Sequence, residues 1–259
     1  VRKATELPLD VHLMIENAAA YYEVKDNIAY VYLNRPEQIN AFNVAMRDDL
    51  HSIFTAIHID DSLKAVIISG NGEKGFCSGA DLTEFGSTPS RVVARKARYL
   101  RDVWDLVQKL PVPSVAILHG YTIGSGLELA MCCDFRVADF KTQFRLPEVA
   151  LAMLPFATGS QTLPRLIGNP KALELLLTSK WFTAEEASDL GLINRLAEHH
   201  QLNEVAKKLI FELINKPPTA LRFAKQAIKR GADIHLSDGL LIEQRLAESI
   251  FSLGISQEK

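Results

Sequence analysis

The sequence predicts an α/β fold, and three observations support that prediction. Short apolar runs that are typical of buried strands alternate with longer stretches whose apolar residues recur at helical spacing. This alternation favours a sheet joined through helices over a helical bundle or a β-sandwich. The chain has 259 residues, 47% of them hydrophobic, so it can bury a large core in one domain with a smaller appendage.

The first elements are predicted to be a β-hairpin and a helix. Residues 21–24 and 28–33 are rich in β-branched and aromatic residues, and the turn signal Lys-Asp-Asn at 25–27 separates them. A helix is expected behind a cap at Asn43, because the apolar positions that follow have helical spacing: Met46, Leu50, Ile53, Phe54 and Ile57.

Two buried strands are predicted next, at residues 65–70 and 115–118. The second leads through a glycine-rich bend, 120–126, into a helix over 127–133. Between the strands we expect a basic helix over 91–109 that carries Arg91, Arg95, Lys96, Arg98 and Arg101. A solvated outer face is the simplest interpretation of these charges, and a phosphate-binding face is the alternative.

The remainder of the chain is predicted to be helical. Two helices are expected after residue 163, the second with Thr183 as its cap. Three amphipathic helices follow, joined at 216–218 and 231–233, and form a C-terminal helical module.

The glycine-rich bend and two glutamates make up the candidate site. A strand, a tight loop and a helix start leave backbone amides without partners, and such amides can stabilise an oxyanion. Glu128 lies in the first turn of the expected helix, and Glu148 follows a proline twenty residues later. Paired carboxylates can divide proton removal and delivery between them. The alternative is that both are acidic residues placed near helix starts by the helix dipole.

Composition excludes several other functions. A net charge of −2 and a pI near 6.4 give no general attraction to nucleic acid or anionic membranes. No apolar run is long enough to span a membrane, and neither nucleotide-binding glycine fingerprint occurs. The three cysteines, Cys77, Cys132 and Cys133, are expected to be reduced and buried, and no metal site is predicted. A cytoplasmic protein is expected, or a mitochondrial matrix protein if a leader has been removed.

Four motifs together resemble the enoyl-CoA hydratase/isomerase family, also called the crotonase superfamily. They read, in order, G-F-C-S-G-A-D from position 75, H-G-Y-T-I-G-S-G-L-E-L-A from 119, C-D at 133 and Q-F-R-L-P-E from 143. The resemblance covers residues 21 to 253. It implies an N-terminal extension at 1–20, a crotonase-like β-β-α spiral core with the acyl-CoA site at 21–200, and a C-terminal helical trimerisation module at 201–259. In the family this module builds a homotrimer, commonly paired into a hexamer. The family's last helix is expected to be either missing or not included in this sequence.

The resemblance also implies roles for individual residues. The backbone amides of Ala80 and Ser125 would form the oxyanion hole, and Glu128 and Glu148 would be the catalytic pair. Substrate-binding positions would be Gly79, Asp81, Gly124 and Phe156. The implied activity is that of an enoyl-CoA hydratase, which adds water to a 2-enoyl-CoA through an enolate. Coenzyme A would enter as part of the substrate, with no other cofactor.

Several positions depart from the family pattern. Ser125 replaces the usual glycine of the oxyanion hole, and Phe156 and Thr158 replace glycines near the acyl group. Phe156 is expected either to reshape the acyl pocket or to pack in the core.

Several alternatives to hydration remain open at this point. The nearest are a Δ3,Δ2-enoyl-CoA isomerase and a hydratase or hydrolase of a cyclic or branched acyl-CoA. An RNA-binding family member that uses the basic helix is a minor alternative, and nucleic acid is not the expected partner. A catalytically silent scaffold is another, against which the two intact glutamates count.

Overall fold

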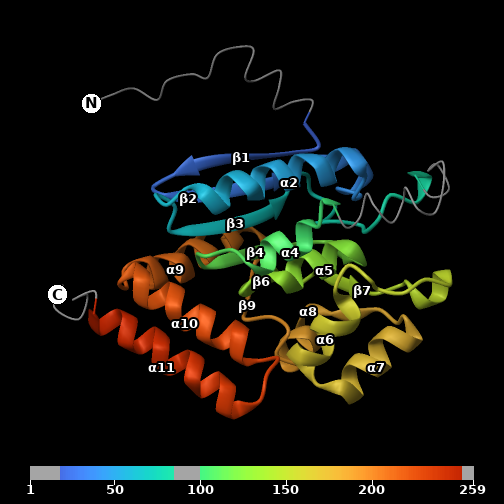
Figure 1. Cartoon of the computed structure of the whole chain (residues 1–259). Coiled ribbons are helices and arrows are strands. Elements are labelled where there is room, and N and C mark those ends of the chain that lie inside the picture. Colours follow the sequence, from blue (N-terminus) through green and yellow to red (C-terminus); the bar gives the residue numbers. More distant parts are fainter. Residues whose placement is uncertain (1–17, 85–99, 253–259) are drawn as a thin grey trace, which may run out of the picture.

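The computed structural model describes residues 18–84 and 100–252 (Figure 1). Its centre is a six-stranded sheet with the order β1-β2-β3-β4-β6-β9, in which β1 and β2 are antiparallel and the later neighbours are parallel. These strands are Ala20–Lys25, Ile28–Leu33, Ala65–Gly70, Ser114–Leu118, Phe135–Asp139 and Arg195–Ala197. A three-stranded sheet is formed by β5 (Tyr121–Ile123), β7 (Gln143–Arg145) and β8 (Phe182–Thr183). The predicted α/β class is therefore confirmed.

Helices cover both faces of the large sheet, because alternate strand residues point to opposite sides. In β2, Ala29 and Val31 join the larger core, with α2 (Val44–Ile59), α4 (Val103–Gln108) and α5 (Ser125–Cys132). Ile28 joins the smaller core on the other face, which α9 (Leu202–Ile214) covers. Among the described residues, α6 (Gly159–Ile167), α7 (Asn169–Thr178) and α8 (Ala184–Asp189) also pack into the larger core. Short 3-10 turns in the described ranges are Pro36–Gln38, Leu82–Glu84, Val149–Leu151 and His199–Gln201.

The early elements form where local chemistry predicts them. The hairpin pairs Lys25 with Ile28 across its tight turn. The Asn43 side chain caps α2 by accepting a hydrogen bond from the amide of Met46, and the predicted apolar positions are the buried ones. Thr183 and Glu186 form a reciprocal capping box at the start of α8. These predictions are confirmed.

The predicted continuous basic helix over 91–109 is wrong in the part that the structure describes. Asp102 has an extended backbone, with ψ of 92°, and its side chain accepts a hydrogen bond from the amide of Asp105. This aspartate cap starts a separate helix, α4, at Val103. Arg101 forms an ion pair of 2.7 Å with Asp48 of α2. Residues 91–99 lie outside the described ranges.

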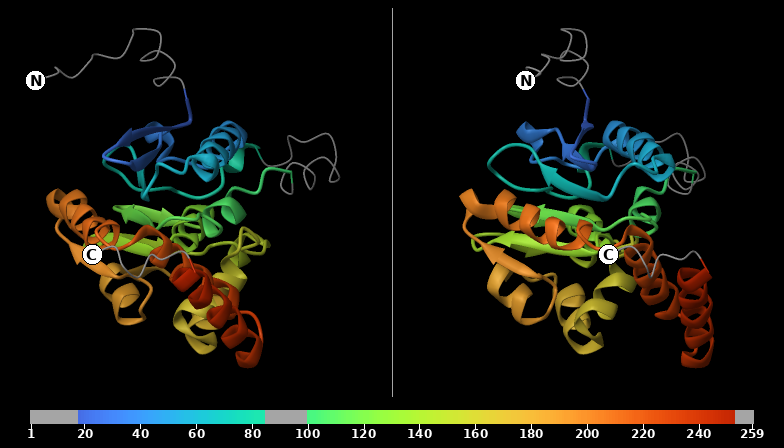
Figure 2. Two further views of the ribbon diagram at one scale, coloured as in Figure 1. Left: turned by 60° about the vertical axis from the view of Figure 1, so that its left-hand side comes forward. Right: turned by 90° about the vertical axis from the view of Figure 1, so that its left-hand side faces the viewer.

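The last two helices, α10 (Pro218–Gly231) and α11 (Leu236–Ser252), pack on each other at the edge of the molecule (Figures 1 and 2). Neither has a buried residue, and Ile228, Leu236 and Phe251 are each more than 70% exposed. Helix α9 differs, because it packs on the sheet. Helices α10 and α11 therefore leave apolar side chains uncovered along their length in the single chain.

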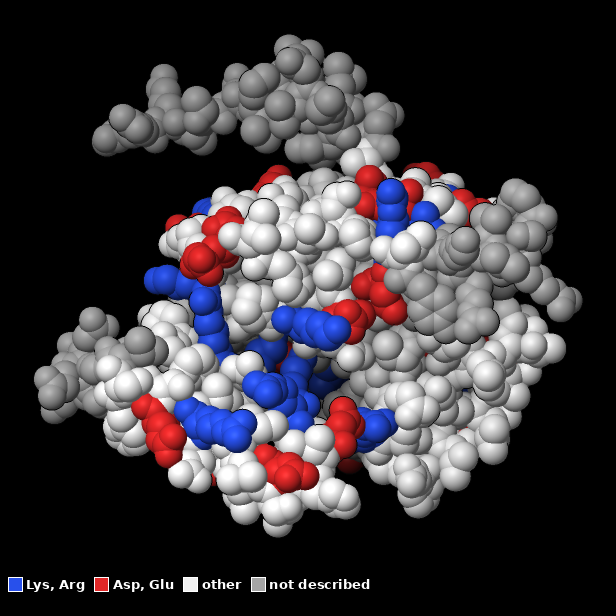
Figure 3. All heavy atoms as spheres, in the orientation of Figure 1, with Lys and Arg blue, Asp and Glu red and all other residues white. Residues whose placement is uncertain are grey.

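Lysine side chains attach α10 to the core. The Lys225 ammonium lies 2.5 Å from the Asp134 carboxylate and 2.6 Å from the carbonyl oxygen of Val112, and Lys229 contacts the other Asp134 oxygen at 2.9 Å. Figure 3 shows Lys and Arg side chains gathered in a hollow in the middle of this face of the molecule. Within the described ranges, no helix is long and apolar enough to cross a membrane.

Candidate active site

The loop after β3 leaves the Ala80 amide available for a ligand. The carbonyl of Gly79 accepts a hydrogen bond of 2.7 Å from the amide of Phe42, and the amide of Asp81 donates one of 3.0 Å to the carbonyl of Phe42. These two bonds fix the loop on either side of Ala80. The amide of Ile123 also donates to the carbonyl of Cys77 at 2.9 Å, which joins this loop to β5.

Two glycines bring this loop against the start of α5. Gly79 has φ of +94° and Gly124 has φ of +48°, a region that favours glycine. A Cβ on Gly124 would lie 3.8 Å from the Cα of Gly79, so the two backbones are in contact. The following residues, Ala80 and Ser125, consequently lie on adjacent segments, as the oxyanion-hole prediction requires.

Neither the Ala80 amide nor the Ser125 amide donates to a protein acceptor among the described residues. Ser125 is the first residue of α5, so its amide is one of those that the helix itself cannot pair. Its carbonyl accepts a 3.3 Å hydrogen bond from the indole of Trp104, which holds this end of the helix in place. Two unpaired amides on adjacent segments suit an anionic oxygen.

Glu128 is a buried carboxylate in the first turn of α5, 1% exposed. Its Oε1 atom accepts a 2.7 Å hydrogen bond from the amide of Gly159, the first residue of α6. A Cβ at position 159 would lie 2.7 Å from that oxygen, so a glycine is needed for the approach. The carboxylate is thus held between the starts of two helices, where the dipoles favour negative charge.

Glu148 approaches the same region from the segment that follows β7. Its Oε1 atom lies 2.6 Å from the point that a Cβ on Gly124 would occupy. Its Oε2 atom is buried, and no described residue hydrogen-bonds to it. Burial raises the pKa of this carboxyl above its ordinary value. A buried oxygen without a protein partner, beside a glycine backbone, is suited to exchange a proton with a ligand.

Comparison with known proteins agrees with this geometry. Residues 23–258 match the Enoyl-CoA hydratase/isomerase family. The chain belongs to that family. It is 35% identical to a crotonyl-CoA hydratase of Syntrophomonas wolfei, over 85% of each chain, and 34% identical to an (E)-benzylidenesuccinyl-CoA hydratase of Thauera aromatica, over 86% of this chain and 87% of that protein. The crystal structure of an enoyl-CoA hydratase from Bacillus anthracis matches with a TM-score of 0.86 at 34% identity, covering 90% of this chain and 91% of that one.

Asp81, a predicted substrate-binding residue of this family member, stabilises the loop that carries Ala80. Its carboxylate contacts the Arg35 guanidinium at 2.9 Å and accepts hydrogen bonds from the amide and hydroxyl of Thr83. These hydrogen bonds, first from Thr83 and then from Arg35, hold the pKa of Asp81 below its ordinary value.

Sequence reasoning missed a second stabilising residue, Asn40. This fully buried residue has φ of +53°, and its side-chain amide donates to the carbonyls of Asn71, Gly75 and Phe76, which precede Ala80 in the chain. The available signal was an asparagine three residues before the Asn43 cap, since asparagine tolerates the left-handed region.

Phe156 does not pack in the core, so that alternative is wrong. Its side chain is 66% exposed, and Leu154 and Leu151 on the same segment are 70% and 47% exposed. This segment connects Glu148 to Gly159, the glycine that contacts Glu128. An exposed apolar group on the segment that links Glu148 to Gly159 agrees with a role at an acyl-binding surface.

The three cysteines are free and buried, as predicted. Burial raises the pKa of Cys77 and Cys133 to about 12 and that of Cys132 to about 11, so all three are neutral thiols at physiological pH. In the ranges that the structure describes, no three His, Cys, Asp or Glu side chains are grouped so that they could hold a metal ion.

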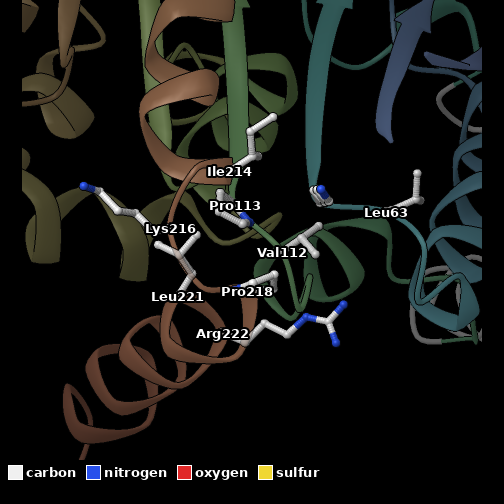
Figure 4. A pocket seen from close by; sticks show the side chains of 9 residues that line it. Leu63, Val112, Pro113, Ile214, Lys216, Pro218, Leu221 and Arg222 are labelled. Carbon is white, nitrogen blue, oxygen red and sulfur yellow. The ribbon is translucent and has the colours of Figure 1, made fainter. Parts of the chain in front are cut away.

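A small cavity of about 20 Å³ lies away from the glutamates (Figure 4). Its lining includes Lys64 before β3, Val112 and Pro113 before β4, and Pro218 at the start of α10. Lys64, Val112 and Pro113 lie at the amino ends of β3 and β4, whereas the loop that carries Ala80 follows the carboxyl end of β3. The cavity is therefore not part of the candidate active site.

Proposed function

We propose that the protein hydrates 2-enoyl-CoA thioesters to 3-hydroxyacyl-CoA products. The observation that carries the proposal is the arrangement of two unpaired amides, at Ala80 and Ser125, beside two buried glutamates that each lie against a glycine backbone. Family membership and the hydratase names of similar proteins support the same reaction class.

The amides of Ala80 and Ser125 serve as the oxyanion hole. Adding water at the β-carbon of the thioester moves negative charge to the carbonyl oxygen and gives an enolate. Donors fixed in a water-excluded site stabilise that charge without reorganising, and each is worth several kcal/mol, roughly 3 by analogy with other oxyanion holes. Because the donor at position 125 is the main chain, the serine side chain does not prevent this role.

Glu128 and Glu148 divide the proton transfers. Glu128, with one oxygen fixed by the Gly159 amide, orients the water and takes its proton. Glu148, whose pKa burial raises, delivers a proton to the α-carbon from its unpaired oxygen. Two carboxyls in one site titrate as a coupled pair, so the pH profile belongs to both.

The substrate is an acyl-CoA whose acyl group is apolar near the double bond. Gly79 and Gly124 let its thioester approach the amides, Asp81 keeps the loop in place, and Phe156 contacts the acyl group with Leu154 beside it. One similar protein is named for an aromatic enoyl-CoA substrate, (E)-benzylidenesuccinyl-CoA. The reaction needs no metal or redox cofactor, and coenzyme A is part of the substrate. Replacing Phe156 by glycine should change the preference among straight, branched and aromatic acyl chains.

We further propose that the chain assembles as a homotrimer or a dimer of trimers. The support is the uncovered apolar side chains of α10 and α11, among them Ile228, Leu236 and Phe251. Surface of this kind is unusual on a monomer unless another molecule covers it. Analytical ultracentrifugation of the full chain measures the assembly.

A comparison of two substrates separates this activity from isomerisation, the second activity in the family's name. Hydration removes the absorbance of a conjugated 2-enoyl thioester, whereas isomerisation of a 3-enoyl-CoA creates it. We expect loss of absorbance with the 2-enoyl substrate. If the protein instead converts only the 3-enoyl substrate and needs only Glu148, the hydratase proposal is wrong and the protein is an isomerase.

A further inference from the structure

Thr158 has a backbone conformation that threonine rarely adopts. Its φ is +96° and its ψ is −14°, and it stands directly before α6 as the N-cap residue. A β-branched residue in this region is strained, whereas glycine reaches it freely. Strain of this kind persists only where surrounding contacts hold the residue in place, and it is found most often at functional sites.

Contacts on both sides hold Thr158 in this conformation. Its hydroxyl lies 3.5 Å from the Cys132 thiol on α5, and that sulfur also contacts the side-chain amide of Gln108 at 3.4 Å. Its carbonyl accepts hydrogen bonds from the amide and the hydroxyl of Thr162, at 2.8 and 2.9 Å. The side chain is thus tied to α5 and the carbonyl to α6.

The residue that follows makes the contact with the proposed catalytic pair. The amide of Gly159 donates the 2.7 Å hydrogen bond to Oε1 of Glu128. Glu128 and Cys132 are four residues apart on α5, so they lie on the same face of that helix one turn apart. Residues 158 and 159 therefore contact two successive turns of α5, one through a hydroxyl and the other through an amide.

We propose that Thr158 is a positioning residue, whose hydroxyl contact with Cys132 fixes the direction of the Gly159 amide and thereby the Glu128 carboxylate. The direction of that amide depends on the backbone angles of residue 158. A glycine at position 158 can adopt several backbone conformations, whereas a threonine whose hydroxyl contacts Cys132 is held in one. Thr158 touches no reacting atom in this proposal, and its effect on the reaction rests on the proposed hydratase function.

Three variants of the full chain test the proposal through hydrogen exchange, which needs no substrate. Residue-resolved mass spectrometry measures hydrogen exchange of the Gly159 amide. This exchange should be about 10-fold faster in Thr158→Gly and Thr158→Val than in wild type, because both variants lose the hydroxyl contact with Cys132. Thr158→Ser keeps the hydroxyl and should exchange at the wild-type rate. Ser179→Gly, which removes another non-glycine residue with φ of +50° after α7, is the matched control and should leave Gly159 unchanged.

Kinetics with crotonyl-CoA then measure the catalytic consequence. We expect kcat of Thr158→Gly to fall about 10-fold with KM within about twofold, because a misdirected carboxylate slows the chemistry more than binding. Its melting temperature should equal or exceed that of wild type because backbone strain is relieved. A merely structural role would instead lower the melting temperature and leave the kcat of the folded enzyme unchanged.

A double-mutant cycle tests whether the contact between Thr158 and Cys132 protects the Gly159 amide. Cys132→Ala and Thr158→Val should each accelerate Gly159 exchange, and the double variant should resemble either single one, since both remove the same contact. Wild-type exchange at Gly159 in Thr158→Gly and Thr158→Val would overturn the proposal. If exchange changes as expected but wild type hydrates no enoyl-CoA, the positioning of Glu128 stands and the proposed hydratase function fails.

Discussion

The Glu128 carboxylate receives the amide of Gly159 at 2.7 Å, a contact between the first turn of α5 and the first residue of α6. A similar arrangement serves Glu148, whose Oε1 atom lies against the backbone of Gly124. Each glutamate of the proposed pair is therefore placed by a glycine that admits it. The glycines at 124 and 159 are as necessary to the site as the carboxylates they contact.

Replacing Gly124 by alanine tests this relationship. The new Cβ would lie 2.6 Å from Oε1 of Glu148, and a φ of +48° strains any side chain. We expect turnover of a 2-enoyl-CoA to fall by about 100-fold, the scale of a misplaced catalytic group.

The matched control is Gly168→Ala, where φ is +81° but nothing lies within 4 Å. It should lower the free energy of unfolding by about 1 kcal/mol and leave kcat unchanged. Equal losses of kcat in both variants would contradict the account.

The oxyanion hole predicts different results for two changes at Ser125. Ser125→Ala keeps the backbone amide and should retain kcat within about twofold, whereas Ser125→Pro removes the amide and should lower kcat by about 100-fold or more. Proline is tolerated at the first position of a helix, so α5 should persist. Steady-state kinetics with circular dichroism as the folding check measure both. A large loss in Ser125→Ala would indicate that the hydroxyl, not the amide, has the function.

Local chemistry allowed much of this structure to be predicted from the sequence. The Asn43 and Thr183 caps, the hairpin and the strand over 65–70 are set by residues close to one another in the chain. The family resemblance supplied the candidate residues of the site. The break before α4 was missed because the periodic pattern outweighed Asp102, whose side chain starts a new helix.

Long-range contacts were beyond prediction from the sequence. The bond from Gly159 to Glu128 joins residues 31 positions apart, and Asn40 reaches carbonyls more than 30 positions away. Helix periodicity also could not distinguish α9, which covers a face of the sheet, from α10 and α11, which leave apolar side chains exposed. All of these helices have an apolar face, and only the tertiary arrangement decides what that face packs against.

Glu148→Gln should stabilise the protein while it slows turnover by about 100-fold or more. Burial raises the pKa of Glu148 above its ordinary 4.5, so the folded state binds the proton more tightly than the unfolded state does. Proton binding to Glu148 therefore stabilises the folded wild-type protein. This stabilisation is fully present below pH 4.5, and it is lost as the pH rises through the raised pKa of Glu148. The stability advantage of the glutamine variant should be small near pH 4 and reach roughly 1 kcal/mol at pH 8, the scale for a buried unpaired polar group. Urea unfolding at several pH values measures it, and an advantage that shrinks as the pH rises would refute this interpretation.

The ion pair between Lys225 and Asp134 is expected to stabilise the packing of α10 on the core. Lys225→Ala leaves Asp134 buried with one partner fewer, and we expect the free energy of unfolding to fall by about 3 kcal/mol. Lys109→Ala, which removes an exposed i,i+4 pair with Asp105, should cost about 0.5 kcal/mol or less. Chemical denaturation compares the two variants at one protein concentration, because assembly would make stability depend on concentration. Equal small losses would show that the pair does not anchor the helix.

The proposed chemistry is tested by hydration of conjugated 2-enoyl-CoA thioesters, with short, branched and aromatic acyl groups, by wild type, Glu128→Gln and Glu148→Gln. The absorbance of the enoyl thioester falls as water adds. We predict that wild type hydrates at least one substrate and that each variant is slower by about 100-fold or more, the scale of lost acid–base catalysis. Full activity of Glu128→Gln, or no hydration of any substrate by wild type, would contradict the two-glutamate mechanism.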